Sequence, residues 1–126
     1  MQYMLLIHAD ETGFARMKPE DGEKAMAGYF AYNDALKKAK VWVGGDRLKP
    51  SATTSTVRVT DGKTKVQDGP FAETKEQLGG YYLIDVPDLD EAIKWAAKCP
   101  GAHHGTMEVR AIWASDTAES RLQYRK

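Results

Sequence analysis

The residues that could perform acid–base chemistry lie apart along this sequence, and the first pair follows a short apolar run. His8 and Asp10 are two positions apart, so they share one face if a strand extends that far. A carboxylate there could orient the imidazole as a general base. The alternative is a surface histidine with only local hydrogen bonds, and the spacing alone does not decide between the two.

Three further side chains could bind a ligand. Tyr29 stands in a predicted helix, where its hydroxyl could line a pocket between helix and sheet. Arg47 is a candidate ligand for an anion, with a solvated surface charge as the alternative. It follows two glycines, but no helix begins there, so they do not form a phosphate-binding loop. Arg110 lies in the last predicted strand, on the face opposite its apolar residues.

Residues 68–80 read DGPFAETKEQLGG and hold the two remaining candidates, Asp68 and Glu73. Pro70 has a fixed φ and restricts the residue before it, and Phe71 is predicted to be a large apolar anchor. The loop should therefore be stiff, as a binding carboxylate requires. A structural corner requires the same stiffness, so both interpretations stay open.

The histidines and the cysteine near the C-terminus do not have the pattern of a site. His103 and His104 are adjacent, so their side chains diverge, and no Cys or His pair elsewhere has the spacing of further metal ligands. Cys99 lacks a base partner and stands at the helix end that does not stabilise a thiolate. We therefore predict a loop at the histidines, no metal site, no cofactor and no cysteine nucleophile.

The composition limits the class of protein. The chain has 126 residues, 42% of them hydrophobic, which is enough for one domain with one core. Lys plus Arg total 18 and Asp plus Glu total 18, so no strong field favours nucleic acid or a membrane surface. A single cysteine, no apolar run of membrane-spanning length and no signal-peptide pattern predict a cytoplasmic protein.

The hydrophobic pattern predicts one domain over residues 1–113 and a polar tail at 114–126. The expected elements are a strand at 3–8, a helix at about 19–40, a strand at 41–43, a hairpin at 56–66, a strand at 81–86, a helix at 88–98 and a strand at 107–113. The polar cluster 10–13 should end the first strand. Gly44 and Gly45 should let the chain turn or pass close to another backbone.

Both predicted helices have an apolar face. The apolar positions are Ala25, Tyr29, Tyr32, Leu36 and Ala39 in the first helix and Leu89, Ala92, Ile93 and Ala96 in the second. Asp88 is expected to cap the second helix, and Glu91 is expected to reach back to the cap.

The dipeptide Asp61-Gly62 between two alternating runs predicts a hairpin with a two-residue turn. The expected cross-strand pairs are Val57 with Val66, Val59 with Thr64 and Arg58 with Lys65. The two like charges should splay into water, unless an acid or a bound anion lies nearby.

Without the hairpin, the element order is that of the split βαβ, or ferredoxin-like, arrangement of an α+β protein. Two helices then cover one face of an antiparallel sheet. The last strand points Glu108, Arg110 and Ile112 to the uncovered face, a mixture of charge and apolar bulk. Such a face suits a second subunit, so we expect a homodimer.

Three stretches, YMLLIHADE, DGPFAETKEQLGGYYLIDVPDLDEAIKWA and MEVRAI, resemble the YCII-related proteins, and in particular their DGPF subgroup. The resemblance covers about residues 2–113. It implies a dimeric α+β barrel in which two ferredoxin-like subunits meet sheet to sheet, with a pocket between sheet and helices in each.

The resemblance also bears on activity. Some YCII-like proteins use a histidine on the first helix and an aspartate near the end of the second, and one branch is a dehydrochlorinase of aromatic degradation. Here no histidine occurs between Ala25 and Asn33, and Lys98 and Cys99 stand where the aspartate is expected, so the pair is not carried over. DGPF proteins are also commonly encoded beside extracytoplasmic-function sigma factors.

Two functions follow as hypotheses. The first is a YCII-like small-molecule pocket protein, acting as a cofactor-independent enzyme of lyase type on a small aromatic or carboxylated metabolite. The second is a non-catalytic, dimeric ligand-binding or regulatory module, associated with a sigma factor as the resemblance implies.

Overall fold

The computed structural model describes residues 1–114. Its strands are β1 Gln2–Ala9, β2 Trp42–Arg47, β3 Ser55–Thr60, β4 Lys63–Asp68, β5 Gln77–Asp85 and β6 Thr106–Ala111. Its helices are α1 Glu11–Ala15, α2 Pro19–Lys38, α3 Leu89–Lys98 and α4 Gly101–His104, with a 3-10 turn η1 at Ser51–Thr53. Apart from Ala114, the predicted polar tail lies outside the described residues.

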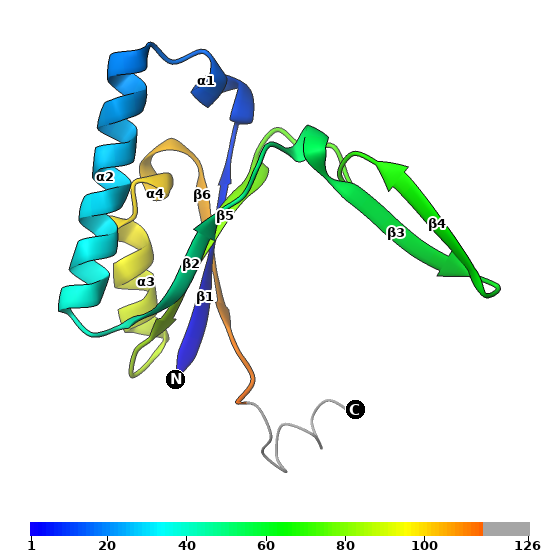
Figure 1. Ribbon diagram of the computed structural model, residues 1–126. Coiled ribbons are helices and arrows are strands. Elements are labelled where there is room, and N and C mark those ends of the chain that lie inside the picture. Colours follow the sequence, from blue (N-terminus) through cyan, green and yellow to red (C-terminus); the bar gives the residue numbers. More distant parts are fainter. Residues whose placement is uncertain (115–126) are drawn as a thin grey trace.

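Four strands form the main sheet in the order β2-β5-β1-β6, and all neighbours are antiparallel. The long helix α2 and the shorter α3 lie side by side on one face of this sheet (Figure 1). The predicted ferredoxin-like α+β fold is therefore confirmed, and strands that are far apart in sequence meet at its centre.

Alternate residues of β1 show how the sheet divides its two faces. Tyr3, Leu5 and Ile7 are buried beneath the helices, whereas Met4 and Leu6 are half-buried on the other face. The buried core is completed by Tyr32, Leu36, Tyr82, Ile84, Val86, Ala92, Ala96 and Cys99. We call the helix-covered side the helix face and the other side the open face.

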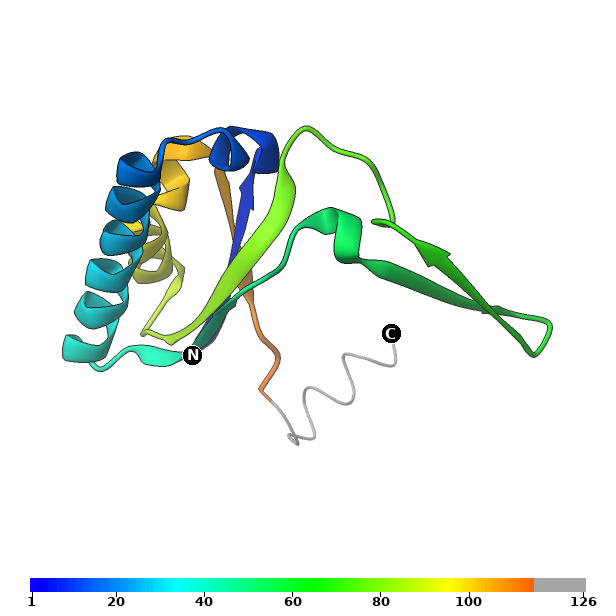
Figure 2. The ribbon, with the colours of Figure 1, turned by 45° about the horizontal axis from the view of Figure 1, so that its top comes forward.

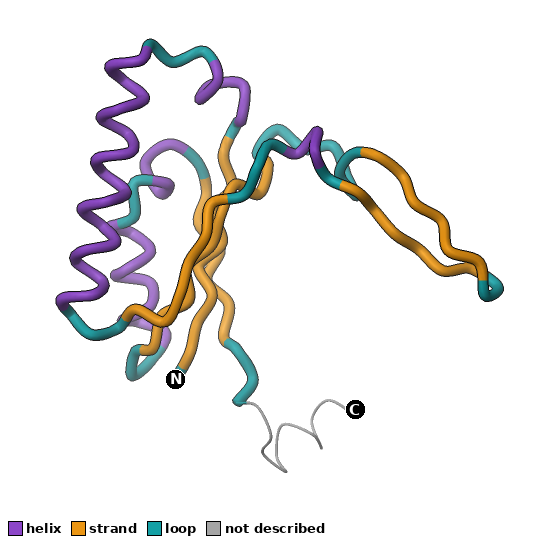
Figure 3. The backbone as a smooth tube through the Cα atoms, in the orientation of Figure 1, coloured by secondary structure: helices purple, strands orange, loops and turns teal. Residues whose placement is uncertain are grey.

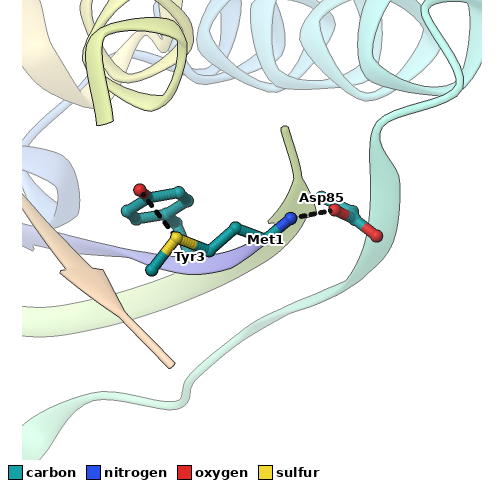
Figure 4. A network of polar contacts seen from close by, with 3 residues as sticks. All are labelled: Met1, Tyr3 and Asp85. Atoms are coloured by element: carbon teal, nitrogen blue, oxygen red, sulfur yellow. Dashed lines mark hydrogen bonds and ion pairs between the residues drawn. The ribbon is translucent and has the colours of Figure 1, made fainter. Parts of the chain in front are cut away.

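Polar contacts tie the ends of the elements together. The N-terminal ammonium group of Met1 donates to Asp85 Oδ1 over 2.8 Å, and the Tyr3 hydroxyl donates to the Met1 sulfur over 3.3 Å (Figure 4). On the helix face, the Tyr32 hydroxyl donates to the carbonyl of Trp95 over 2.7 Å, joining α2 to α3. These contacts fix the ends of β1 and β5 and the spacing of the two helices.

The hairpin β3–β4, residues 55–68, leaves the domain as a separate two-stranded ribbon, which we call the arm (Figures 1 and 3). Asp61 has φ 52° and Gly62 φ 75°, as a two-residue hairpin turn requires. All three predicted cross-strand pairs are present, including Arg58 opposite Lys65. The predicted register is confirmed, and both strands are exposed over nearly their whole length.

Two short helices occur where the sequence predicts none. The cluster 10–13 does end β1, but it goes on to form α1, because the Asp10 carboxylate accepts from the Thr12 amide over 2.9 Å and caps the helix. His103 and His104 lie in α4 and not in a loop, since Pro100 already has helical dihedral angles and the chain continues into one more turn. Both histidine side chains are exposed.

Two strands are longer than expected. β2 continues through Gly44 and Gly45 to Arg47 instead of ending at residue 43. A Cβ on Gly45 would lie 2.8 Å from Tyr82 Cδ1, so this glycine serves close approach and not a turn. β5 likewise begins at Gln77, four residues before the predicted start.

Three smaller predictions about side chains are wrong. Phe71 is not an apolar anchor: it is 77% exposed, because its loop runs outside the core, and the Arg58 guanidinium stacks 5.3 Å above its ring. Leu89 and Ile93 are about half exposed, because only the Ala92 and Ala96 side of α3 meets the sheet. Asp88 does accept from the Glu91 amide, but the Glu91 carboxylate pairs with Lys94.

Candidate functional site

A cavity of about 380 Å³ lies on the helix face, between α2 and the β2 side of the sheet. The short helix α1 covers part of it with Phe14. Most of its wall is apolar or aromatic, including Met26, Phe30, Trp42 and Tyr82. Its size and lining are those of a site for a small organic molecule.

Two closely packed glycines of the sheet line the cavity. Gly45 and Gly80 both line it, on the adjacent strands β2 and β5. A Cβ on Gly80 would lie 2.9 Å from the Asp46 carbonyl oxygen, so neither position accepts a side chain without a shift of its neighbours. The glycines of the sequence therefore make the floor of the site.

Arg47 lies at the end of β2 with its side chain among cavity residues. Its guanidinium carbon is 4.9 Å from the centre of the Phe14 ring, and its Nη1 is 3.8 Å from the sulfur of Met26. Within residues 1–114, no carboxylate forms an ion pair with it. An arginine held between an aromatic ring and a thioether keeps its hydrogen-bonding capacity for a ligand.

Three acidic residues line the cavity, and each of their carboxylates is engaged elsewhere. Asp10 accepts from the Thr12 hydroxyl over 2.7 Å as well as from its amide, and these hydrogen bonds lower the pKa of Asp10. Glu11 accepts from the amide and the hydroxyl of Ser51, over 2.5 and 2.8 Å. Asp46 accepts from the Tyr81 hydroxyl over 2.7 Å. None of these carboxylates is free to neutralise Arg47.

Two neutral polar groups face the cavity as hydrogen-bond donors. The Tyr82 hydroxyl donates to Asn33 Oδ1 over 2.5 Å, which leaves the amide hydrogens of Asn33 available. The Tyr29 hydroxyl has no hydrogen-bond partner among the described residues. Burial raises the pKa of Tyr29, nearby Cys99 adds to the rise and Arg47 opposes it. Tyr29 therefore remains a neutral donor at physiological pH.

The structure brings together only some of the candidate residues named from the sequence. Tyr29, Arg47 and Asp10 line the cavity. His8 and Arg110 lie on the open face, where His8 Nε2 contacts Glu108 Oε1.

The two candidates from residues 68–80, Asp68 and Glu73, lie outside the cavity and outside the main sheet. Asp68 ends the arm, and Glu73 is exposed in the loop that follows it. His8 lies on the open face whereas Asp10 lines the cavity, because β1 ends at Ala9 and Asp10 caps α1.

Cys99 and the C-terminal histidines are outside the site. The Cys99 side chain is fully buried, and burial raises its pKa to about 11, which keeps the thiol neutral. Within the described part of the chain, no group of three or more His, Cys, Asp or Glu side chains is placed to hold a metal ion.

Sequence reasoning missed Asn33 and Tyr82 as site residues. Asn33 follows Tyr29 by four positions on α2, so a helical projection from Tyr29 would have found it. Tyr82 alternates with Ile84 and Gly80 along β5, and its burial is consistent with that period of two. Phe14 could not be found in this way, because α1 itself was not predicted.

Comparisons with known proteins agree with the architecture. An uncharacterised protein from Rhizobium meliloti is 39% identical over 114 residues, which cover 89% of this chain and 92% of the relative. Among solved structures, 5-chloro-2-hydroxyhydroquinone dehydrochlorinase from Burkholderia phenoliruptrix, in complex with 2,5-dihydroxybenzoquinone, superposes with a TM-score of 0.52. That match covers 90% of this chain and 94% of the enzyme, at 14% identity, so it shows a shared fold.

No helix among residues 1–114 is both long and apolar enough to span a membrane. The sequence model of the YCII-related domain family matches residues 1–116, nearly the whole chain. The element order, the antiparallel sheet and this match lead to one conclusion: the chain belongs to the YCII-related domain family.

Proposed function

We propose that this protein binds a small aromatic carboxylate in the cavity between α2 and the sheet. The observation that carries the proposal is Arg47, an exposed guanidinium group among the residues that line an aromatic cavity, with no carboxylate partner among the described residues. A carboxylate ligand would supply that partner through charge-assisted hydrogen bonds, which are the stronger kind.

The rest of the cavity fits the other half of such a ligand. Trp42, Tyr82 and Phe30 offer apolar surface to a planar ring, while Tyr29 and Asn33 offer donors to its oxygen substituents. A volume of about 380 Å³ suits a single substituted ring. The neighbour of the same fold was solved with 2,5-dihydroxybenzoquinone, a ligand of this size class.

The reaction we favour is of lyase type. In an elimination, a base removes a proton while the leaving group departs, and a neutral phenol can stabilise charge that develops on a substrate oxygen. Tyr29 lines the cavity and stays protonated, so it is the candidate for the second role. Asp10 is the candidate base, although its hydrogen bonds from Thr12 weaken its basicity.

The alternative function is a non-catalytic ligand-binding or regulatory module. One observation favours it: each acidic residue that lines the cavity already accepts hydrogen bonds through its carboxylate. A site that lacks a free base can bind a ligand without converting it.

Calorimetric titration with benzoate, hydroxybenzoates and their neutral amides tests the proposal. Charge-assisted bonds contribute roughly 1.5–3 kcal/mol, so Arg47→Met should weaken binding of the acids by about 10- to 100-fold. The matched control is Lys49→Met, which removes a nearby exposed cation outside the cavity and should change affinity less than about twofold.

Equal affinities of the Arg47→Met variant and the wild type for the acids would disprove the anion site. A second incubation uses chlorinated hydroxybenzoates, because an elimination needs a leaving group that the unsubstituted acids lack. Nuclear magnetic resonance of these incubated ligands separates the two functions. A new product supports the lyase, and recovery of the unchanged ligand supports the binding module.

The proposal includes a pair of copies that meet open face to open face. Leu6, Met4 and Leu83 are half-buried apolar residues there, beside the charged Glu108 and Arg110. A sheet with one uncovered, partly apolar face is commonly covered by a symmetric partner. Sedimentation at micromolar concentration that shows only a 14.0 kDa species would disprove this pair.

A further inference from the structure

The arm exposes a stripe of valines that no part of the described chain covers. Val57, Val59 and Val66 are 59, 66 and 61% exposed, and the cross-strand register places all three on one side of the ribbon. Their neighbours Arg58, Lys65 and Thr60 point to the other side. Alternation of this kind is typical of a strand with one buried face, so the sequence specifies burial that residues 1–114 do not provide.

The root of the arm is fixed to the domain. The Gly69 amide donates to the Thr54 carbonyl over 2.7 Å, and the Thr56 hydroxyl donates to the Gly69 carbonyl over 3.0 Å. Glu11 of α1 accepts two hydrogen bonds from Ser51 in η1, at the base of β3. The arm therefore has a defined direction, although an isolated two-stranded ribbon is only marginally stable in water.

That direction indicates what covers the valines. The arm extends away from the helix layer, on the side of the open face, in both ribbon views (Figures 1 and 2). A second copy that packs on the open face comes within reach of the arm. A two-fold axis would then bring the arm of each copy to the other, because a symmetric interface repeats every contact.

The area of the open face supports an additional contact. Four strands about 4.8 Å apart and about six residues long cover roughly 400 Å² in projection. Stable interfaces bury about 800 Å² of accessible surface per partner, which is a larger measure than projected area, so a contact beyond the open face would favour a stable pair. One side of the arm, with two strands of six residues, adds roughly 200 Å².

We propose that the valine side of the arm packs against a second copy of this chain and clasps the sheet-to-sheet pair. This inference requires the sheet-to-sheet pair of the proposed function, and it is independent of which ligand the cavity binds. Burial of three valines removes apolar surface from water in each of two equivalent contacts, so the arm should strengthen association considerably.

Two adjacent substitutions in the full-length chain test the clasp. Val66→Asp places a charge on the valine side, whereas Gln67→Asp places the same charge on the other side of the same strand. Both side chains are exposed, so neither should disturb the folded monomer, which circular dichroism verifies. Sedimentation equilibrium should show a dimer whose dissociation constant rises at least tenfold in Val66→Asp and less than about twofold in Gln67→Asp.

Hydrogen exchange gives an independent measurement on the wild type. The amides of β3 and β4 should gain protection as the protein concentration rises through the dissociation constant. A dimer that Val66→Asp leaves as tight as the wild type, or arm amides whose protection is independent of concentration, would overturn the clasp while keeping the pair. A wild type that is monomeric throughout would overturn both.

Discussion

The two faces of the main sheet carry out different tasks, although they are built from alternate residues of the same strands. On the helix face, Leu5 is fully buried and the glycines leave a floor for the cavity. On the open face, its neighbour Leu6 is half-buried beside the His8–Glu108 contact. A change on the first face should therefore act on folding and on the site, and a change on the second should act on association.

The adjacent leucines of β1 test this difference with the largest expected effect. Leu5→Ala should destabilise the protein by about 2–5 kcal/mol, because it removes a fully buried side chain and leaves a cavity. Leu6→Ala should cost about 1 kcal/mol in the monomer, since much of its surface is already in water. Urea denaturation at submicromolar concentration measures both, and equal losses would show that the open face belongs to the core.

The loss of stability at high pH should also come from a group on the helix face, Cys99. Burial raises the pKa of Cys99 from 9.0 to about 11, so the folded state prefers the neutral thiol. The resulting stability is fully present below pH 9 and is lost as the pH rises through 11, by roughly 2–3 kcal/mol. Denaturation between pH 8 and 11 should show a smaller loss for Cys99→Ala than for the wild type. Identical losses would mean that other groups, such as the buried tyrosines, dominate.

The two glycines of β2 offer a comparison within one dipeptide. Gly45→Ala places a Cβ 2.8 Å from Tyr82 Cδ1 and 3.0 Å from the Tyr81 carbonyl oxygen, so it should cost about 1–3 kcal/mol. It should also reduce the affinity for a cavity ligand. Gly44→Ala meets only Leu83 Cδ1, at 4.0 Å, and should be neutral or stabilising by up to about 1 kcal/mol. Thermal unfolding with and without ligand distinguishes the two, and a harmless Gly45→Ala would refute the close-packed floor.

The smallest effect is expected for the charged contact of the open face. Glu108→Gln removes the carboxylate beside His8, in a pair whose glutamate is half exposed, and should change the stability of the monomer by less than about 1 kcal/mol. Denaturation of dilute protein at pH 7 provides the measurement. A loss of several kcal/mol would erase the distinction between the faces.

Local patterns predicted most of the fold. The Asp61-Gly62 turn sets the register of the arm, and the period of two in β1 separates Leu5 from Leu6. The short helix α1 was missed because five residues are too few for a hydrophobic period. Its formation depends on the Asp10 cap and on the contact of Glu11 with Ser51, a partner 40 residues away.

The cavity could be predicted only in part. Tyr29 and Arg47 are chemically distinctive, so their residue types identified them as candidates. Asn33 and Tyr82 are distinctive only as a pair, and their hydrogen bond joins positions 49 residues apart. Phe71 shows the opposite error: a large aromatic side chain predicts burial, yet it lies outside the core with Arg58 above it.

The sequence by itself determined the strands and long helices, the turn of the arm and the YCII-related family, because these follow from local periodicity and from a long matching stretch. The tertiary structure alone decided which polar groups meet. Packing of α1 and α2 on the sheet gives Arg47 the neighbours Phe14 and Met26, and no carboxylate of residues 1–114 forms an ion pair with it. Such contacts depend on how distant segments close on each other, and a short-range pattern cannot specify that.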